Sequence, residues 1–183
     1  MNTVSSNNRK TYDMAYIAFF TVLIIICSWI SIPTVVPFTL QTFGVFAAVA
    51  ILGGKRGTIS ILIYMLLGLI GIPVFSGFRG GFAGLFGMTG GFIFGFLFSA
   101  LAMWGIEKLF GKKQKVLICS MIIGLLICYG IGTFWFIQVY GRQTGEIGIG
   151  TVLNLCVVPF IIPDLAKISL AYMLAGKIRR YVI

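Results

Sequence analysis

The chain has 183 residues, of which 59% are hydrophobic and 10% charged, and its mean hydropathy is +1.06. This composition excludes an ordinary soluble domain and predicts one integral membrane domain over residues 1–183. The formal net charge of +10 does not indicate a protein that binds nucleic acid, because the basic residues stand in short groups between apolar segments, as membrane topology requires.

Residues 1–13 are polar and are expected to form a short cytoplasmic lead-in. The six apolar segments that follow cover residues 14–32, 43–54, 58–75, 91–110, 116–139 and 151–176. The first is too long for the core of a signal peptide and lacks a cleavage pattern, so it is expected to be a span. The second is short of the roughly 20 residues of a full crossing, so it either borrows residues from the preceding loop or crosses where the protein shields it. The sequence therefore predicts an all-α membrane protein, a bundle of six transmembrane helices.

The connections differ in composition. Residues 33–42 contain two prolines and several hydrogen-bonding side chains but no charge, which predicts extended backbone folded against the protein. A Lys-Arg-Gly sequence at residues 55–57 predicts a tight basic turn. Residues 76–91 combine many glycines with Phe, Leu and Met, which predicts a packed, lid-like loop rather than a flexible linker. Gly91 and Gly95 form a G-x-x-x-G pattern that predicts close helix packing.

The chain offers few groups for catalysis. It has no histidine, and Cys27, Cys119, Cys128 and Cys156 lie within apolar segments without the spacing of a metal site or a disulfide framework. We expect these cysteines to be buried thiols. No catalytic residues, metal or cofactor are predicted, and the chain is not expected to be an enzyme.

The distribution of basic residues predicts the orientation. With a cytoplasmic N-terminus, six spans place eleven basic residues inside and two, Arg79 and Arg142, outside, which is a strong positive-inside signal. The eleven are Arg9, Lys10, Lys55, Arg56, Lys108, Lys112, Lys113, Lys115, Lys177, Arg179 and Arg180. Both termini are thus predicted to be cytoplasmic. Because the proline-rich and glycine-rich connections lie outside, a ligand pocket is expected to open outward.

A carboxylate and an ammonium stand three residues apart in the last apolar segment, at Asp164 and Lys167. An ionised side chain near the bilayer centre costs about 3 kcal/mol on insertion scales, and such residues usually mark a substrate path. On a helix the two share one face, where each partly neutralises the other. Pro159 and Pro163 disfavour helix just before them, and broken helices at membrane depth are tolerated where they line cavities. A purely structural ion pair between helices is the alternative.

The remaining polar groups predicted on the outer side complete a candidate pocket. They are Thr39, Gln41, Thr42, Arg79, Thr89 and Asn154. An arginine in an apolar loop suits a carboxylate, and the Asp/Lys pair suits a neutral polar ring with N–H and C=O groups. Aromatic side chains could enclose an aliphatic portion between them, or face lipid instead. These are Phe38, Tyr64, Phe75, Phe78, Phe82 and Phe86. The pattern indicates a small amphipathic acid with a polar head.

Four motifs in order resemble those of the BioY family. They are Val-Pro-Phe-Thr-Leu-Gln-Thr at residues 36–42, Gly-Leu-Ile-Gly-Ile-Pro-Val-Phe-Ser-Gly at residues 68–77 followed by Gly80 and Gly81, Thr-Gly-Gly-Phe at residues 89–92, and Val-Pro-Phe at residues 158–160 followed by Asp164 and Lys167. The resemblance covers nearly the whole chain. The sequence departs from the family pattern at two places. Pro163 stands where glycine is expected before the aspartate, and in the first helix Ala15 and Ala18 are three residues apart, whereas the family often has an A-x-x-x-A pattern.

The resemblance implies the biotin-specific S component of an energy-coupling factor (ECF) transporter in the cell membrane. It implies a six-helix bundle that captures biotin from outside, and partnership with a transmembrane coupling protein and two ABC ATPases that hydrolyse the ATP. Asp164 would accept from the ureido N–H groups, Lys167 would lie beside the ureido carbonyl, and Arg79 would hold the carboxylate. Gly80 joins the substrate-binding residues through its motif.

A stand-alone secondary transporter for a small organic acid, driven by protons through Asp164, is the main alternative. It predicts uptake by vesicles that contain only this chain. A membrane scaffold, which predicts no saturable ligand binding, is another.

Overall fold

The computed structural model describes residues 6–145 and 147–182, and the side chains of these residues except 6–8, 144 and 180–182. The first five residues of the predicted lead-in and the side chain of Arg180 therefore lie outside the described part. Within it, the chain forms eight helices and one two-stranded sheet. The elements are α1 Ser6–Trp29, β1 Ser31–Ile32, β2 Phe38–Thr39, α2 Gln41–Leu52, α3 Gly54–Leu69, α4 Gly81–Phe86, α5 Gly90–Phe110, α6 Gln114–Thr144, α7 Ile149–Cys156 and α8 Val158–Val182.

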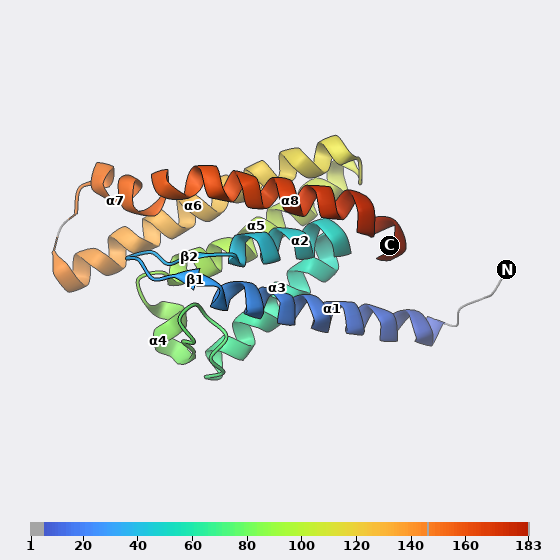
Figure 1. Cartoon of the computed structure of the whole chain (residues 1–183), viewed down its shortest axis with the longest axis horizontal. Helices are drawn as coiled ribbons and strands as arrows, with labels where there is room; N and C mark the ends of the chain where they lie inside the picture. Colours follow the sequence, from blue (N-terminus) through green and yellow to red (C-terminus); the bar gives the residue numbers. More distant parts are fainter. Residues whose placement is uncertain (1–5, 146, 183) are drawn as a thin grey trace.

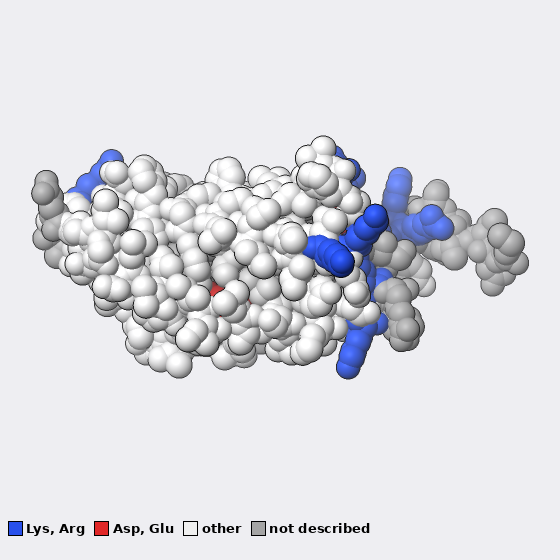
Figure 2. Space-filling model, turned by 90° about the horizontal axis from the view of Figure 1, so that it is seen from above, with Lys and Arg blue, Asp and Glu red and all other residues white. Residues whose placement is uncertain are grey.

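The long helices run along the long axis of the molecule (Figure 1), and α1 begins at the same end at which α8 finishes. The turn between α2 and α3 and the connection between α5 and α6 lie at this end, whereas the hairpin, α4 and α7 lie toward the other. Basic side chains gather at the first end (Figure 2). We call it the basic end. The molecule is thus polarised along its axis, as a membrane protein with a positive-inside charge bias is.

Four stretches of helix in the described residues are long and apolar enough to cross a membrane. They are Arg9–Trp29, Gly90–Phe110, Gln114–Gln143 and Ile149–Arg179. The predicted second and third spans are the shorter helices α2 and α3, with 12 and 16 residues. The chain is therefore a multi-pass, mainly helical membrane protein.

Helix α2 is short because protein surrounds it. Eleven of its twelve residues are buried, and it packs against α1, α3 and most extensively against α8. A helix shielded in this way does not need to satisfy the length that lipid imposes on an exposed span. Both expectations for this segment are met in part, because protein shields the helix and the helix also takes Gln41 and Thr42 from the predicted loop.

The boundaries of α3 differ from the predicted ones. The tight turn before it is at Gly53, which has φ 82°, and residues 55–57 already belong to the helix. The helix ends at Leu69 rather than at Phe75, and Gly71 follows it with φ 101°. Glycine takes this left-handed conformation without steric cost, so each glycine sets a boundary.

The connection after α1 is extended, as predicted. Residues Ser31 and Ile32 pair antiparallel with Thr39 and Phe38. The backbone N–H of Leu40 donates to the carbonyl of Ile30 at 3.1 Å, which brings the chain back to the end of α1. This hairpin delivers the start of α2 to the centre of the bundle.

The connection between α3 and α5, residues 70–89, contains most of the predicted glycine-rich loop and is called the glycine-rich loop from here on; it is packed against the bundle, as predicted. Trp29 Nε1 donates to the carbonyl of Pro73 at 2.9 Å, and Ser28 Oγ donates to the carbonyl of Val74 at 2.5 Å. On the far side, Trp135 Nε1 donates to the carbonyl of Gly87 at 3.0 Å. The loop also contains α4, which the sequence did not predict. Helices α1 and α6 therefore hold the loop at both ends.

The last apolar segment is broken where one of the two prolines predicts it. Helix α7 ends at Cys156 and α8 begins at Val158, with Pro159 in its first turn. Pro163 was expected to interrupt the helix too, but it lies inside α8. Pro163 lies near the start of α8. Because proline has no backbone N–H, the helix lacks only the hydrogen bond that residue 163 would donate to the Pro159 carbonyl.

One of the four cysteine predictions is wrong, because Cys119 on α6 is exposed. Cys27, Cys128 and Cys156 are buried, as predicted.

The G-x-x-x-G pattern brings α5 against α6, as predicted. A Cβ atom placed on Gly91 would lie 2.1 Å from the Trp135 Cβ, and one on Gly95 would lie 3.0 Å from the Cys128 Cα. Small residues allow helix backbones in membranes to approach closely. This contact fixes α6 and its pocket residues relative to α5.

We expect Gly91→Ala to lower the thermal stability of the purified protein, because the added methyl overlaps Trp135 and overpacking typically costs about 1–3 kcal/mol. Gly105→Ala on the same helix is the matched control, since a Cβ there meets no heavy atom within 4 Å. Melting curves in one detergent compare the two. Equal melting temperatures would contradict the packing role of Gly91.

Candidate functional site

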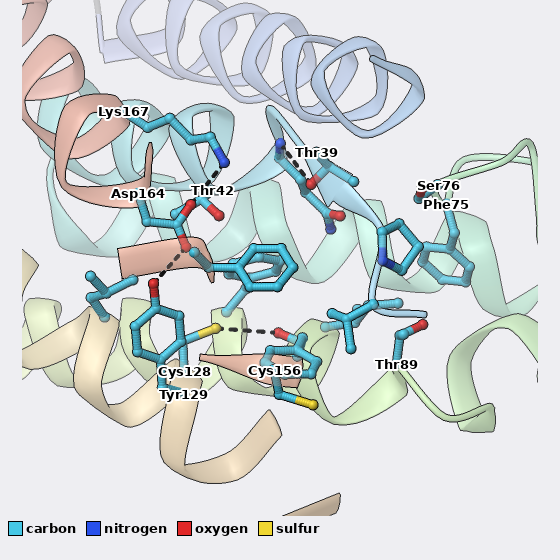
Figure 3. Close-up of a pocket in the computed structure, with 18 of the residues that line it drawn as sticks. Thr39, Thr42, Phe75, Ser76, Thr89, Cys128, Tyr129, Cys156, Asp164 and Lys167 are labelled. Atoms are coloured by element: carbon cyan, nitrogen blue, oxygen red, sulfur yellow. Dashed lines mark hydrogen bonds and ion pairs between the residues drawn. The ribbon is translucent and has the colours of Figure 1, made fainter. Parts of the chain in front are cut away.

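A pocket with a cavity volume of about 70 Å³ lies between the hairpin, the glycine-rich loop and helices α2, α5, α6, α7 and α8. It is lined mainly by apolar groups, with polar groups at both ends (Figure 3). Its lining residues are Val36, Pro37, Thr39, Gln41, Thr42, Phe75, Ser76, Arg79, Gly84, Thr89, Phe92, Ile93, Phe96, Leu125, Cys128, Tyr129, Cys156, Phe160, Asp164 and Lys167.

The buried end holds a network of three polar groups (Figure 3). Lys167 Nζ lies 2.8 Å from Asp164 Oδ1, and the Tyr129 hydroxyl donates to Asp164 Oδ2 at 2.8 Å. Asp164 and Lys167 are only 3% and 7% exposed. Both lie on α8, three residues apart, so one helical face presents them to the pocket.

The network retains capacity for a ligand. A carboxylate has about four lone-pair sites, and Lys167 and Tyr129 occupy two of those of Asp164. An ammonium has three donors, of which Asp164 takes one. Lys167 Nζ also lies 4.2 Å from the centroid of the Phe38 ring, which stacks on Phe160. The pair can therefore both donate to and accept from a neutral polar group beside it.

The start of α2 supplies the next polar groups. Gln41 and Thr42 are buried at the pocket, and the hydroxyl of Thr39 accepts the backbone N–H of Gln41 at 3.2 Å. Gln41 Nε2 donates to the hydroxyl oxygen of Tyr64 at 2.9 Å. Tyr64 is fully buried and does not line the pocket. Its role is to hold the Gln41 amide in place.

The opposite end of the pocket belongs to the glycine-rich loop, where Phe75, Ser76 and Thr89 lie across from the ion pair (Figure 3). Arg79 is exposed, in contrast to Asp164. A pair of backbone hydrogen bonds joins Phe75 and Arg79, and Arg79 Nε donates to the Ser76 carbonyl at 3.1 Å. The loop thus holds a guanidinium at the exposed end.

The structure brings eight of the predicted site residues together at one pocket. They are Thr39, Gln41, Thr42, Phe75, Arg79, Thr89, Asp164 and Lys167. Three others, Tyr64, Gly80 and Asn154, do not line it. Gly80 supports the loop instead, because a Cβ there would lie 2.3 Å from the Ile72 carbonyl oxygen. Asn154 is exposed on α7, whose buried residues are Val152 and Cys156.

Several aromatic side chains that were expected to enclose the ligand lie outside the pocket. Phe78 and Phe82 are more than 60% exposed, and Phe86 stacks on Phe82 with ring centroids 4.1 Å apart. None of the three lines the pocket. Their place is taken by residues of α5 and α6 that the sequence analysis did not select. These are Phe92, Ile93, Phe96, Leu125, Cys128 and Tyr129.

Helical spacing could have found the missed residues. Leu125, Cys128 and Tyr129 recur at intervals of three and four on α6. Cys156 and Phe160 continue the same spacing to Asp164 and Lys167 across the break between α7 and α8. Residues three and four apart share a helix face, so both rows point to a common side.

Comparison with known proteins gives a consistent result. The model of the BioY family matches residues 1–183. The biotin transporter BioY of Thermotoga maritima is 39% identical over 164 residues, covering 88% of this chain and 92% of that protein. The biotin transporter BioY2 of Lactococcus lactis is 36% identical, covering 87% and 86%.

The fold matches a crystal structure described as the S-component for biotin from an ECF-type ABC transporter. The TM-score is 0.85 at 30% identity, and the match covers 97% of this chain and 95% of the other. Family model, sequence relatives and fold agree over nearly the full length, and the chain therefore belongs to the BioY family.

Proposed function

We propose that the chain captures biotin in this pocket as the S component of an ECF-type ABC importer. The observation that carries the proposal is the pocket itself, with a buried donor–acceptor pair at one end, an arginine at the other and apolar residues between them. The names of its relatives and of its structural neighbour support the same ligand. In this role the chain is a transporter subunit and not an enzyme.

The polar head of biotin is a ureido ring with two N–H groups and one carbonyl. In our proposal Asp164 accepts from the N–H groups and Lys167 donates to the carbonyl. The hydrogen bond from Tyr129 fixes the carboxylate for this task. Gln41 and Thr42, which are buried at the same pocket, are further partners for the ring.

The tail of biotin is an aliphatic chain that ends in a carboxylate. Phe92, Phe96 and Phe75 supply apolar surface along the pocket for the chain. Arg79 at the exposed end offers a planar fork of donors, which matches a carboxylate. The ligand would thus enter head first.

We also propose that six helices cross the cell membrane with both termini cytoplasmic and the pocket open to the outside. The support is the gathering of basic residues at the basic end, where α1 begins and α8 ends (Figure 2). In this arrangement α2 and α3 count as the short second and third crossings.

The energy for uptake would come from partners. An S component of the ECF type works with a transmembrane coupling protein and two ABC ATPases, and we propose this module as the partner. The alternative is a stand-alone secondary transporter for a small organic acid, which needs no such module.

Replacing Asp164 by Asn removes a charged acceptor, so we expect biotin affinity to fall by at least ~1 kcal/mol, roughly fivefold. Calorimetry on the purified variant measures the change. Asn154→Ala, at an exposed residue away from the pocket, is the control and should bind like the unmodified protein. Circular dichroism verifies that both variants are folded. Undiminished affinity in a folded Asp164→Asn variant would refute the role of Asp164.

Replacing Arg79 by Ala should weaken biotin binding by roughly tenfold or more, since a hydrogen bond to a charged group is lost. Biotinamide, which lacks the carboxylate, should be affected much less. Arg142→Ala, the other basic residue predicted outside, does not line the pocket and is the matched control. An equal loss for both ligands would contradict the assignment of Arg79 to the carboxylate.

Uptake assays with vesicles distinguish an ECF-type importer from a stand-alone secondary transporter. Right-side-out vesicles that contain only this chain should bind added biotin but not accumulate it under a pH gradient. Addition of the coupling protein and ATPases with ATP inside should produce uptake. Inside-out vesicles without the module should bind little. Accumulation driven by the pH gradient alone would favour the alternative.

A further inference from the structure

A second hollow, which we call the basic-end groove, lies far along the molecule from the pocket. It has a cavity volume of about 510 Å³, and α1, the junction of α2 and α3, and the end of α5 line it. Its lining residues are Asp13, Ile17, Leu52, Gly53, Gly54, Lys55, Arg56, Ile59, Trp104, Glu107, Lys108 and Lys112. None of them lines the candidate biotin pocket.

The two acidic side chains of the groove are occupied by the protein itself. Asp13 pairs with Arg56 at 3.4 Å. Glu107 accepts the backbone N–H of Gly54 at 2.5 Å and pairs with Arg179, which lies outside the groove, at 2.8 Å. These contacts connect α1 to α3 and α3 to α5 and α8. Both carboxylates therefore contribute to the fold. The groove has two acidic and four basic side chains, so it keeps a net positive charge.

Of the three lysines that line the groove, Lys112 pairs with Glu107 at 3.9 Å, so two remain for a ligand. Lys55 is exposed and has no ion-pair partner among the described residues. Lys108 is also exposed, and its Nζ lies 4.5 Å from the centroid of the Trp104 ring. Such a cation–π contact positions the ammonium without neutralising its charge. The groove thus presents fixed positive charge to whatever occupies it.

Apolar side chains also line the groove. Ile17 on α1, Ile59 on α3 and Trp104 on α5 line it and are half-buried. Tryptophan is enriched at the level of the lipid headgroups, and basic groups next to membrane helices attract anionic lipid. An occupant with an anion at one end and a hydrocarbon portion at the other matches both parts of the lining. Free phosphate matches only the basic residues and leaves the apolar ones without a partner.

We propose that the basic-end groove binds one anionic glycerophospholipid. Its phosphodiester would lie between Lys55 and Lys108, and an acyl chain would follow Ile17 and Ile59. This site is independent of the biotin pocket. It requires only that the basic end lie at a membrane surface.

Native mass spectrometry of the full-length protein, titrated with phosphatidylglycerol or phosphatidylcholine, tests the site. We expect one phosphatidylglycerol to bind with clear preference over phosphatidylcholine. The double variant Lys55→Gln, Lys108→Gln should weaken phosphatidylglycerol binding by roughly tenfold or more, because it removes the two ammonium groups that contact the phosphodiester in this proposal. Inorganic phosphate should not compete at millimolar concentration.

The matched control is Lys115→Gln, Lys177→Gln, which removes the same charge from exposed residues outside the groove. It should retain phosphatidylglycerol binding, and both double variants should retain biotin affinity. Equal weakening by the two double variants would overturn the proposal in favour of diffuse charge attraction. Competition by inorganic phosphate would overturn it in favour of a simple anion site. Loss of affinity for the coupling protein without loss of lipid would assign the groove to a protein partner.

Discussion

The ion pair between Asp164 and Lys167 is the interaction on which the site depends. Each charge alone would be costly at membrane depth, but together they are neutral and share a 2.8 Å contact. Breaking a buried pair by removing one partner typically costs about 3–5 kcal/mol, because it leaves an uncompensated charge. The pair therefore constrains α8, and Tyr129 extends the constraint to α6. A polar binding surface can exist inside an apolar bundle because its charges are paired and hydrogen-bonded in this way.

The two sides of the pocket are built differently. Helices α5 and α6 meet through glycines, so the side that carries Phe92 and Cys128 is set by close backbone contact. The opposite side is a loop held by a few hydrogen bonds from Trp29, Ser28 and Trp135. A loop held by a few hydrogen bonds opens at lower free energy than helices packed along their length do. Passage of a ligand to the buried pair is thus easier past the loop than between the helices.

Sequence patterns predicted the helical membrane class, the extended connection, the G-x-x-x-G contact and the eight residues that meet at the pocket. Charge in an apolar segment and turn-forming residues are local signals, so they can be read without a fold. The errors share another cause. Asn154 and Phe82 have suitable chemistry, but which face of a helix or loop turns inward is decided by tertiary packing. Tyr129 was missed because the spacing of Leu125, Cys128 and Tyr129 marks one face of α6 without indicating that Asp164 on α8 lies beside that face.

Helix α2 has a consequence for how the chain is assembled. It is too short to span a bilayer unaided, and its buried surface is matched most extensively by α8, which follows α3, α5, α6 and α7 in the chain. Residues 41–52 therefore lack this partner while the intervening helices are synthesised. A stable position for this helix, and with it the polar surface at Gln41 and Thr42, is reached only once α8 has entered the bundle. Biogenesis of the binding site is then a late event.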